Sequence, residues 1–138
     1  MMDIWIMTLF MIIINYAIVS NSMLVLKFGV YNHLNKIYMS LLMGAVMLVG
    51  HFVLSRNWTS VIILTAVSIV LLFMIRRQIL IDDDQFTKAM IEHHSTAVLM
   101  ATTIKNKTSN PHVSRLAQEI IASQSKEIDL MKSWLIKT

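Results

Sequence analysis

The stretch AMIEHHSTAVLM, residues 89–100, places His93 and His94 between Met90 and Met100. Imidazole nitrogens bind copper, zinc, iron and nickel, and thioether sulfurs prefer Cu(I). The chain has no cysteine, which excludes disulfides, thiolate metal sites and thiol redox chemistry. Any soft metal ligand must therefore be one of the twelve methionines.

Catalytic motifs that use similar residues are absent around these histidines. The zinc-protease pattern HExxH does not occur. A di-iron site needs Glu-x-x-His on two helices and two further carboxylates, which this region does not supply. Ser95 has no evident base and acid for a hydrolytic triad. We therefore predict that the protein is not an enzyme. An oxidoreductase that uses a metal ion bound by these residues is an alternative, but the sequence predicts no substrate pocket for it.

The composition of the 138-residue chain is typical of a membrane protein. Hydrophobic residues make up 56% and charged residues 14%, with a mean hydropathy of +0.63, against about 45–50% and about 25% in soluble domains. Residues 1–81 carry one acid and five bases, whereas residues 82–138 carry seven of each. The net charge of +4 thus lies in the apolar part. No basic stripe with interleaved aromatics is present, so we predict no nucleic-acid partner.

Three uncharged or nearly uncharged runs predict transmembrane helices at residues 4–26, 37–55 and 58–75. Each is close to the roughly 20 residues that cross a bilayer core of about 30 Å. The first run lacks the basic start and small-residue cleavage site of a signal peptide. We therefore predict a three-helix transmembrane region over residues 1–80, with the lipid bilayer as its partner.

Residues 81–138 are amphipathic and predict a soluble helical hairpin. Asp82–Asp84 favour a helix start, because acids stabilise the positive end of the helix dipole. We expect this helix to run from about 83 to 106. Asn110 and Pro111 suit the start of a second helix that continues to about 136. Two helices joined by so short a loop form an antiparallel pair.

Helical periodicity predicts which side chains line the seam between the two helices. On the first helix a sector of about 120° holds several candidates: Phe86, Met90, His93, His94, Ala97 and Met100. On the second helix one face holds Leu116, Ala117, Ile120, Gln124, Glu127, Met131, Trp134 and Leu135. Glu92 points about 100° away from the first sector. Buried imidazole, amide and carboxylate groups cost free energy unless they have hydrogen-bond or metal partners. The polar residues of this predicted seam therefore indicate that it does more than hold the two helices together.

A hairpin of fewer than about 60 residues leaves one apolar side uncovered and is marginal alone. A second copy would complete a four-helix bundle whose ligands converge near the dimer axis. We therefore predict a homodimer or a higher homo-oligomer. The membrane surface or the transmembrane helices of the same chain are alternative covers.

These residues support two hypotheses about the histidine pair. In one, Met90, His93, His94 and Met100 bind a metal ion with Met131 opposite them, and Gln124 and Glu127 orient the imidazoles by hydrogen bonds. Such binding should weaken below about pH 6, as histidines protonate. In the other, the histidines are polar contacts to Glu92, Gln124 or Glu127, within a structural module that drives oligomerisation.

A second candidate metal path lies in the second predicted span. Met39, Met43, Met47 and His51 recur every four residues and share one slowly drifting face. Thioethers and imidazole suit copper. Methionine is also an ordinary apolar residue that fills gaps beside residues such as Gly44 and Gly50. His51 lies near the end of the span, where it could reach the membrane interface.

The runs DDQFTKAMIEHHSTAVLM and NPHVSRLAQEIIASQSKEIDLMKSWL resemble the CopM-like copper-binding family, a group of ferritin-like helical domains long classed as of unknown function. The segment YMSLLMGAVM at 38–47 resembles the membrane-anchored branch, in which three spans precede the histidine motif. The shared positions are Asp84, Phe86, Met90, Ile91, His93, His94, Ala97, Leu116, Ala117, Ile120, Gln124, Glu127, Ile128, Met131 and Leu135. The resemblance implies a helical bundle that binds Cu(I) or Cu(II) through Met and His, in bacterial metal tolerance or trafficking. Glu92 stands where the family commonly has proline.

The side of the membrane that holds the hairpin is predicted differently by two arguments. Lys27, Lys36, Arg76 and Arg77 flank the spans on the hairpin side, against Arg56 on the other. The positive-inside rule therefore places the hairpin in the cytoplasm. The resemblance implies the opposite, and we favour the outer, periplasmic side of a bacterial inner membrane because copper handling fits there. The sequence does not identify a partner transporter or chaperone.

Overall fold

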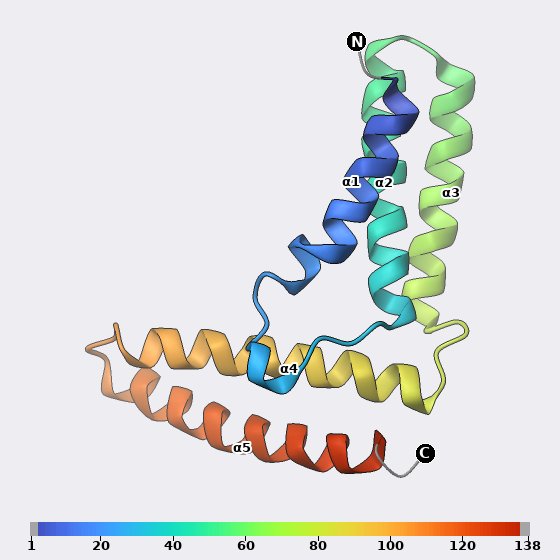
Figure 1. Ribbon diagram of the computed structural model, residues 1–138. Helices are drawn as coiled ribbons and strands as arrows, with labels where there is room; N and C mark the ends of the chain where they lie inside the picture. Colours follow the sequence, from blue (N-terminus) through green and yellow to red (C-terminus); the bar gives the residue numbers. More distant parts are fainter. Residues whose placement is uncertain (1–2, 136–138) are drawn as a thin grey trace. The chain divides into compact units, whose positions relative to one another are not determined.

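The computed structural model describes residues 3–135, and these residues form five α-helices and two short 3₁₀ helices (Figure 1). No β-strand occurs within this range. The predicted all-helical fold, with three long apolar helices followed by a helical hairpin, is confirmed. The helices are α1 (Ile4–Ala17), η1 (Val19–Asn21), η2 (Leu26–Phe28), α2 (Leu34–Leu54), α3 (Trp58–Arg77), α4 (Asp83–Lys105) and α5 (Pro111–Leu135).

The chain forms two compact units whose boundaries do not follow a single cut in the sequence. One unit contains the chain up to Asn21 together with Leu34–Ile81, and thus α1, α2 and α3. The other contains Ser22–His33 together with the chain from Asp82 onward, and thus η2, α4 and α5. We call residues 22–33 the strap segment. It connects α1 to α2 along the chain, yet it packs with the hairpin.

In the first unit α2 packs against both α1 and α3. A Cβ atom placed on Gly44 would lie 2.6 Å from the side chain of Ile12, so α1 and α2 approach closely at this glycine. All three helical stretches are long and apolar enough to cross a membrane: Ile4–Asn21, Leu34–Leu54 and Trp58–Arg77. Large apolar side chains such as Leu9, Ile62 and Ile69 stay exposed on this unit.

The first apolar helix is shorter than the predicted span of 4–26. The α-helix ends at Ala17, and one 3₁₀ turn carries the chain to Asn21. There the Ser20 hydroxyl donates to the Tyr16 carbonyl at 2.6 Å, and the Asn21 amide donates to the Ala17 carbonyl at 2.9 Å. Short polar side chains that bond the local backbone in this way compete with helix continuation. The prediction that the helix reaches residue 26 was therefore wrong.

The start of α2 is tied to the end of η1 by a buried lysine. Lys36 Nζ donates to the Asn21 side-chain oxygen at 2.7 Å and lies 5.8 Å from the centre of the Tyr16 ring. The aliphatic stem of a lysine can lie among apolar groups while its ammonium group keeps polar partners. The contact between Lys36 and Asn21 thus holds together the two points of the first unit between which the strap segment runs.

Both hairpin helices begin where the sequence predicted. The Asp82 side chain accepts a hydrogen bond of 2.8 Å from the Gln85 backbone N–H and caps α4. The Asn110 side chain accepts from the His112 N–H at 2.9 Å, and Pro111 is the first residue of α5. The first of these helices ends at Lys105, within one residue of the predicted end, and α5 extends to Leu135, the last described residue, so its predicted end at about 136 lies outside the described residues.

The hairpin core contains a residue from outside the hairpin. Ile91 and Val98 of α4 pack with Ile128 and Met131 of α5, and Phe28 of the strap segment completes this buried cluster. The strap segment crosses α4 at η2 (Figure 1). Lys27 and Lys132 lie over the Phe28 ring, with Nζ-to-centroid distances of 4.8 and 5.4 Å. Burying a phenylalanine in this way stabilises a fold by about 1.5–3 kcal/mol.

A glycine allows the strap segment to leave η2. Gly29 has a φ angle of +94°, a conformation that side chains with a Cβ atom rarely adopt. A Cβ atom at this position would also lie 3.3 Å from the Tyr31 ring. The turn at Gly29 thus directs Tyr31 and His33 back along the hairpin.

We expect Phe28→Ala to destabilise the hairpin by about 3–5 kcal/mol, because it leaves a cavity in the core cluster. Leu26→Ala is the matched control, since Leu26 lies in the same 3₁₀ turn and is 79% exposed. Hydrogen exchange of α5 amides in the detergent-solubilised protein measures the effect. Equal exchange rates in the two variants would show that Phe28 is not part of the hairpin core.

Candidate functional site

His94 lies in the seam between α4 and α5 and is only 7% exposed. Its Nδ1 is 2.8 Å from the Met90 carbonyl oxygen, and its Nε2 is 2.7 Å from a Glu127 carboxylate oxygen. A carbonyl oxygen only accepts hydrogen bonds, so Nδ1 of His94 donates to the Met90 carbonyl, and Nε2 lies within hydrogen-bond distance of the Glu127 carboxylate. The Nδ1–H bond fixes the ring, and Nε2 is the nitrogen that faces the open carboxylate of Glu127.

His93 is in a different environment although it is the next residue. Its side chain is exposed, and its ring centre lies 6.0 Å from that of His94. The prediction that both histidines line the buried seam was therefore wrong for His93. Successive residues of a helix point about 100° apart, so only one of two neighbours can enter a narrow seam.

The buried seam on α4 is rotated from the predicted one. It contains Ile91, His94, Val98 and Ala101, whereas Phe86 and Met100 are 53% and 57% exposed. Both sets recur with helical spacing, and both are largely apolar. Periodicity alone therefore could not show which of the two faces α5.

The residues predicted opposite the histidines have three different positions on α5. Met131 is buried in the core cluster with Phe28 and Ile91. Gln124 is half-buried, and Glu127 is exposed apart from its contact with His94. Of the two side chains predicted to orient an imidazole, Glu127 has the predicted contact.

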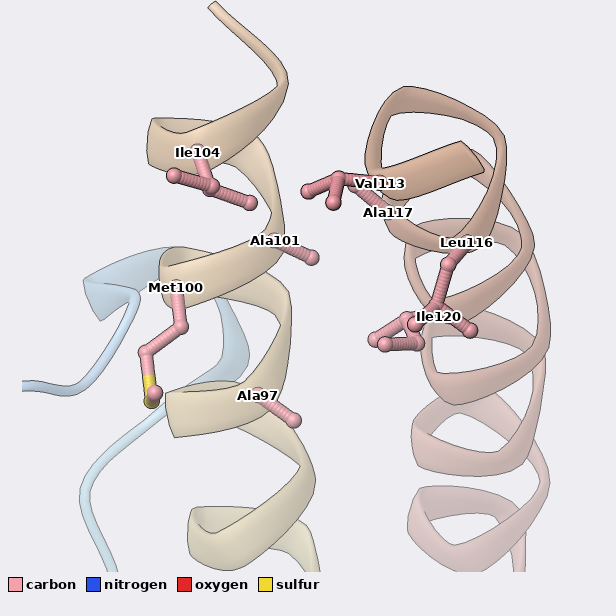
Figure 2. A pocket seen from close by; sticks show the side chains of 8 residues that line it. All are labelled: Ala97, Met100, Ala101, Ile104, Val113, Leu116, Ala117 and Ile120. Atoms are coloured by element: carbon pink, nitrogen blue, oxygen red, sulfur yellow. The ribbon is translucent and has the colours of Figure 1, made fainter. Parts of the chain in front are cut away.

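An open apolar groove of about 430 Å³ lies beside the seam (Figure 2). Its alanines, Ala97, Ala101 and Ala117, leave room between the two helices. The longer side chains that line it are Met100, Ile104, Val113, Leu116 and Ile120. The groove is formed by residues of α4 and α5 alone, so both of its walls come from the hairpin.

The groove is part of a wider apolar surface of the hairpin, which we call the open face. Its large exposed side chains are Phe86, Met100, Ile104, Leu116 and Trp134. His93 lies on the same side of α4 as Ala97 and Met100, because these residues are four and seven positions apart. Of the predicted methionine–histidine stripe, His93 and Met100 thus lie on the open face, whereas His94 lies in the seam and Met90 packs against the core cluster.

The second candidate path, along α2, is partly committed to helix packing. Met39 and His51 are exposed, Met47 is half-buried, and the Met43 sulfur accepts a contact from the Asn15 amide of α1. The His51 ring packs edge-on against Phe52 at a centroid distance of 5.2 Å. These four residues do share one face of α2, and their metal binding remains a prediction.

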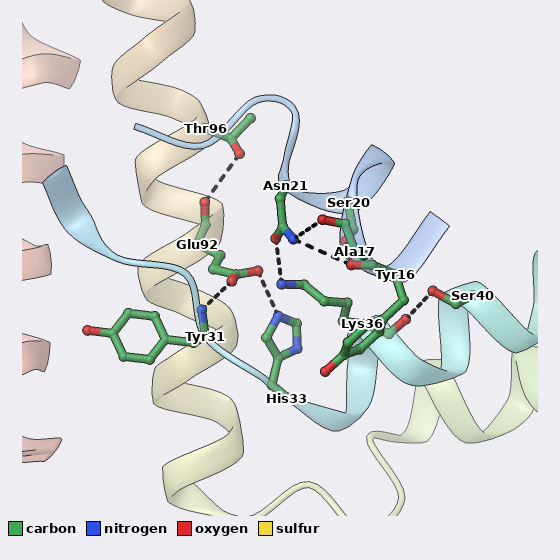
Figure 3. A network of polar contacts seen from close by, with 10 residues as sticks. All are labelled: Tyr16, Ala17, Ser20, Asn21, Tyr31, His33, Lys36, Ser40, Glu92 and Thr96. Carbon is green, nitrogen blue, oxygen red and sulfur yellow. Dashed lines mark hydrogen bonds and ion pairs between the residues drawn. The ribbon is translucent and has the colours of Figure 1, made fainter. Parts of the chain in front are cut away.

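Glu92 has a structural role that the sequence did not reveal (Figure 3). Its two carboxylate oxygens contact the strap segment: one accepts from the Tyr31 N–H at 2.7 Å, and the other lies 3.1 Å from His33 Nε2. The hydroxyl of Ser95 accepts from the Val25 N–H at 2.8 Å. The one sequence signal for this role was that Glu92 is a carboxylate on the side of the helix away from the methionine–histidine stripe. Its partners lie about sixty residues earlier in the chain, beyond the reach of periodicity.

Comparisons with known proteins match this hairpin to a family. The model of a domain of unknown function, DUF305, matches residues 83–138. An uncharacterized protein of Acanthamoeba polyphaga mimivirus is 41% identical over 108 residues, which cover 75% of this chain and 71% of the relative. The chain belongs to the DUF305 family. No solved structure matches it.

The DUF305 match agrees with the predicted relationship at the level of the domain family, and copper binding by this chain remains a prediction. A viral relative gives no support to the predicted bacterial inner membrane. The matched DUF305 region begins at residue 83, so the strap segment lies outside it although it completes the core of the hairpin.

No group of three or more His, Asp or Glu side chains that could hold a metal ion is found between residues 3 and 135. The DUF305 hairpin instead offers pairs: His94 with Glu127, and His93 beside them on the open face. For a single hairpin to hold a metal ion, the side chains of His93, His94 and Glu127 would have to approach one another, or methionine thioethers would have to complete the ligand set.

We expect His93 and His94 to differ in their effect on the stability of the hairpin. His94→Ala removes a buried ring with two hydrogen bonds and should cost about 1–3 kcal/mol. His93→Ala removes an exposed ring and should change stability by less than about 0.5 kcal/mol. Thermal unfolding followed by circular dichroism compares the two variants. Equal melting temperatures would contradict the buried position of His94.

Proposed function

We propose that the protein is a membrane-anchored metal-binding protein that holds copper through the histidines and methionines of α4, in metal tolerance or trafficking and without catalysis. The observation that carries the proposal is the position of His94. Its Nδ1 is bonded to the Met90 carbonyl, which leaves Nε2 toward Glu127 and the open side of the seam. A ligating histidine commonly has one nitrogen bonded to a carbonyl in this way.

Metal binding at His94 would replace the contact between Nε2 and the Glu127 carboxylate. Deprotonated Nε2 would donate its lone pair to the ion, and the Glu127 carboxylate would either orient the ring or join as an oxygen ligand. The Glu127 side chain is about half exposed, so it can move without leaving a buried charge. The DUF305 hairpin thus presents a fixed imidazole beside an adjustable carboxylate.

Copper is the cargo that the surrounding side chains suit best. Met90 lies one turn before His94, and Met100 and His93 lie on the open face. Thioether and imidazole together favour Cu(I), and imidazole with carboxylate accepts Cu(II). Of the five predicted ligands, Met131 is the least suited, because its sulfur is enclosed in the core cluster.

A second copy would supply further ligands and cover the open face. The open face carries large exposed apolar side chains and an apolar groove. A two-fold axis through this face would bring His93 and Met100 of both copies onto the same interface. We therefore propose a homodimer whose four hairpin helices form one bundle.

Membrane anchoring is supported by the first unit. Its three helices have the length and hydropathy of membrane spans, and their outward side chains are apolar. Exposing so many large apolar groups to water would be unusual for a soluble protein. We propose that α1, α2 and α3 cross a lipid bilayer.

One observation favours a structural alternative. His94 is already satisfied by two hydrogen bonds, which is the arrangement of a structural histidine. In this alternative the hairpin is a self-association module, and His93 is a polar contact in the interface. Self-association would then be independent of metal.

We expect the full-length protein in detergent to bind copper and the His93→Ala/His94→Ala variant to lose at least about tenfold in affinity. Glu127→Gln should weaken binding by about tenfold if Glu127 orients the ring. Competition titrations with Cu(I) and Cu(II) chelators measure both. His112→Ala is the matched control, because His112 is an exposed histidine at the start of α5. Binding of both copper ions by the double variant at wild-type strength would refute the site.

We expect Leu116→Lys to weaken self-association by at least about tenfold, because it places an unpaired charge in the apolar interface. Gln118→Lys adds the same charge on the exposed side of α5 and should have little effect. Sedimentation equilibrium in density-matched detergent gives the association constants. A wild-type protein that remains monomeric over the accessible concentrations would contradict the dimer. Self-association that persists in the double histidine variant and ignores metal would favour the structural alternative.

A further inference from the structure

We propose that the strap segment is an intramolecular cap that closes one side of the hairpin to other copies, and that Glu92 locks it in place. The part of this proposal that concerns assembly rests on the proposed dimer. The lock itself depends only on contacts within the second unit.

The polar contacts of the strap segment are specific and buried. Glu92 accepts from the Tyr31 N–H at 2.7 Å and lies 3.1 Å from His33 Nε2, and all three groups are on the covered side of α4 (Figure 3). Ser95, which is fully buried, accepts from the Val25 N–H at 2.8 Å. Each end of the strap segment is therefore held by a side chain of α4 through a backbone N–H.

Between its two anchored ends, the strap segment makes an apolar contact that covers the core of the hairpin. Phe28 lies in the core cluster with Ile91, Val98, Ile128 and Met131. Without the strap segment this cluster would lack its cover, and the hairpin would present a second apolar surface. Lys132 of α5 also lies over the Phe28 ring, so the strap segment contacts both hairpin helices.

The covered side and the open face are on opposite sides of α4. Ser95 anchors the strap segment, and Ala97, two residues later, lines the groove of the open face. Two residues correspond to about 200° around a helix. A hairpin with two opposite apolar sides could associate head to tail without closing, whereas one with a single open face forms a closed pair. The strap segment thus restricts assembly to the open face.

The absence of native cysteine allows the strap position to be tested in the full-length protein. Val25→Cys with Ser95→Cys should form an intramolecular disulfide on mild oxidation, because the hydrogen bond between these residues places their backbones within bridging range. The control pair Val25→Cys with Ser133→Cys uses an exposed residue of α5 and should not form one. No preference for the first pair would overturn the cap.

The lock is tested by Glu92→Ala and Glu92→Gln, with Glu119→Ala as a matched control on an exposed glutamate of α5. Trypsin cleavage after Lys27, followed by mass spectrometry, reports release of the strap segment. Glu92→Ala should accelerate this cleavage by at least about tenfold, because two buried partners lose their acceptor. Glu92→Gln keeps an oxygen for the Tyr31 N–H and an amide for His33, so its rate should stay within about threefold of wild type.

Sedimentation of the same variants tests the consequence for assembly. Glu92→Ala should form species larger than a dimer, and adding the Val25→Cys/Ser95→Cys disulfide should restore the dimer. Ser95→Ala removes one anchor and should give a smaller effect, and circular dichroism confirms that α4 and α5 are retained. Unchanged cleavage in Glu92→Ala would overturn the lock. A monomeric wild type would overturn the proposed dimer and the assembly role of the cap, while the cleavage rates would still decide the lock.

Discussion

Two packed helices can bury only the seam between them, and the two flat sides of the pair stay exposed unless something else covers them. The hairpin of this DUF305 protein covers one side with residues 22–33 of its own chain. That cover determines which residues of α4 are enclosed. Glu92 and Ser95 face the strap segment, Ile91 and Val98 face the core, and His93 and Met100 remain outside.

The same arrangement divides the histidine pair between two environments. His94 is held by the Met90 carbonyl and the Glu127 carboxylate, so its orientation is set before any ligand arrives. His93 is free of such restraints within the hairpin and lies on the surface that a second copy would cover. In the proposed metal site, His94 would be a ligand of fixed orientation beside the less restrained His93, which would suit a protein that takes up and releases an ion.

Much of the fold was predictable because its signals are local. Charge-free runs marked the three long helices, and Asp82 and Asn110 marked the starts of α4 and α5 through side-chain caps.

The end of the first helix was missed, because Ser20 and Asn21 bond the backbone within a run that is otherwise apolar. The seam of α4 was misplaced by one residue, because two adjacent faces of this helix carry apolar side chains with the same period. The strap segment could not be found at all, because its contacts with Glu92 and Ser95 join positions far apart in sequence.

The position of Glu92 links these findings to the choice between a metal site and a structural module. A carboxylate in the middle of the histidine motif is an obvious candidate ligand, yet both of its oxygens are used by the strap segment. Recruiting it to a metal ion would release Tyr31 and His33 and uncover the core around Phe28. Glu127 carries no such structural duty apart from its contact with His94, and it lies on the accessible side of the seam. The two acids therefore differ in what they could contribute to the proposed metal site: Glu92 holds the strap segment on the hairpin, whereas Glu127 is the carboxylate that a metal ion at His94 would use without releasing that segment.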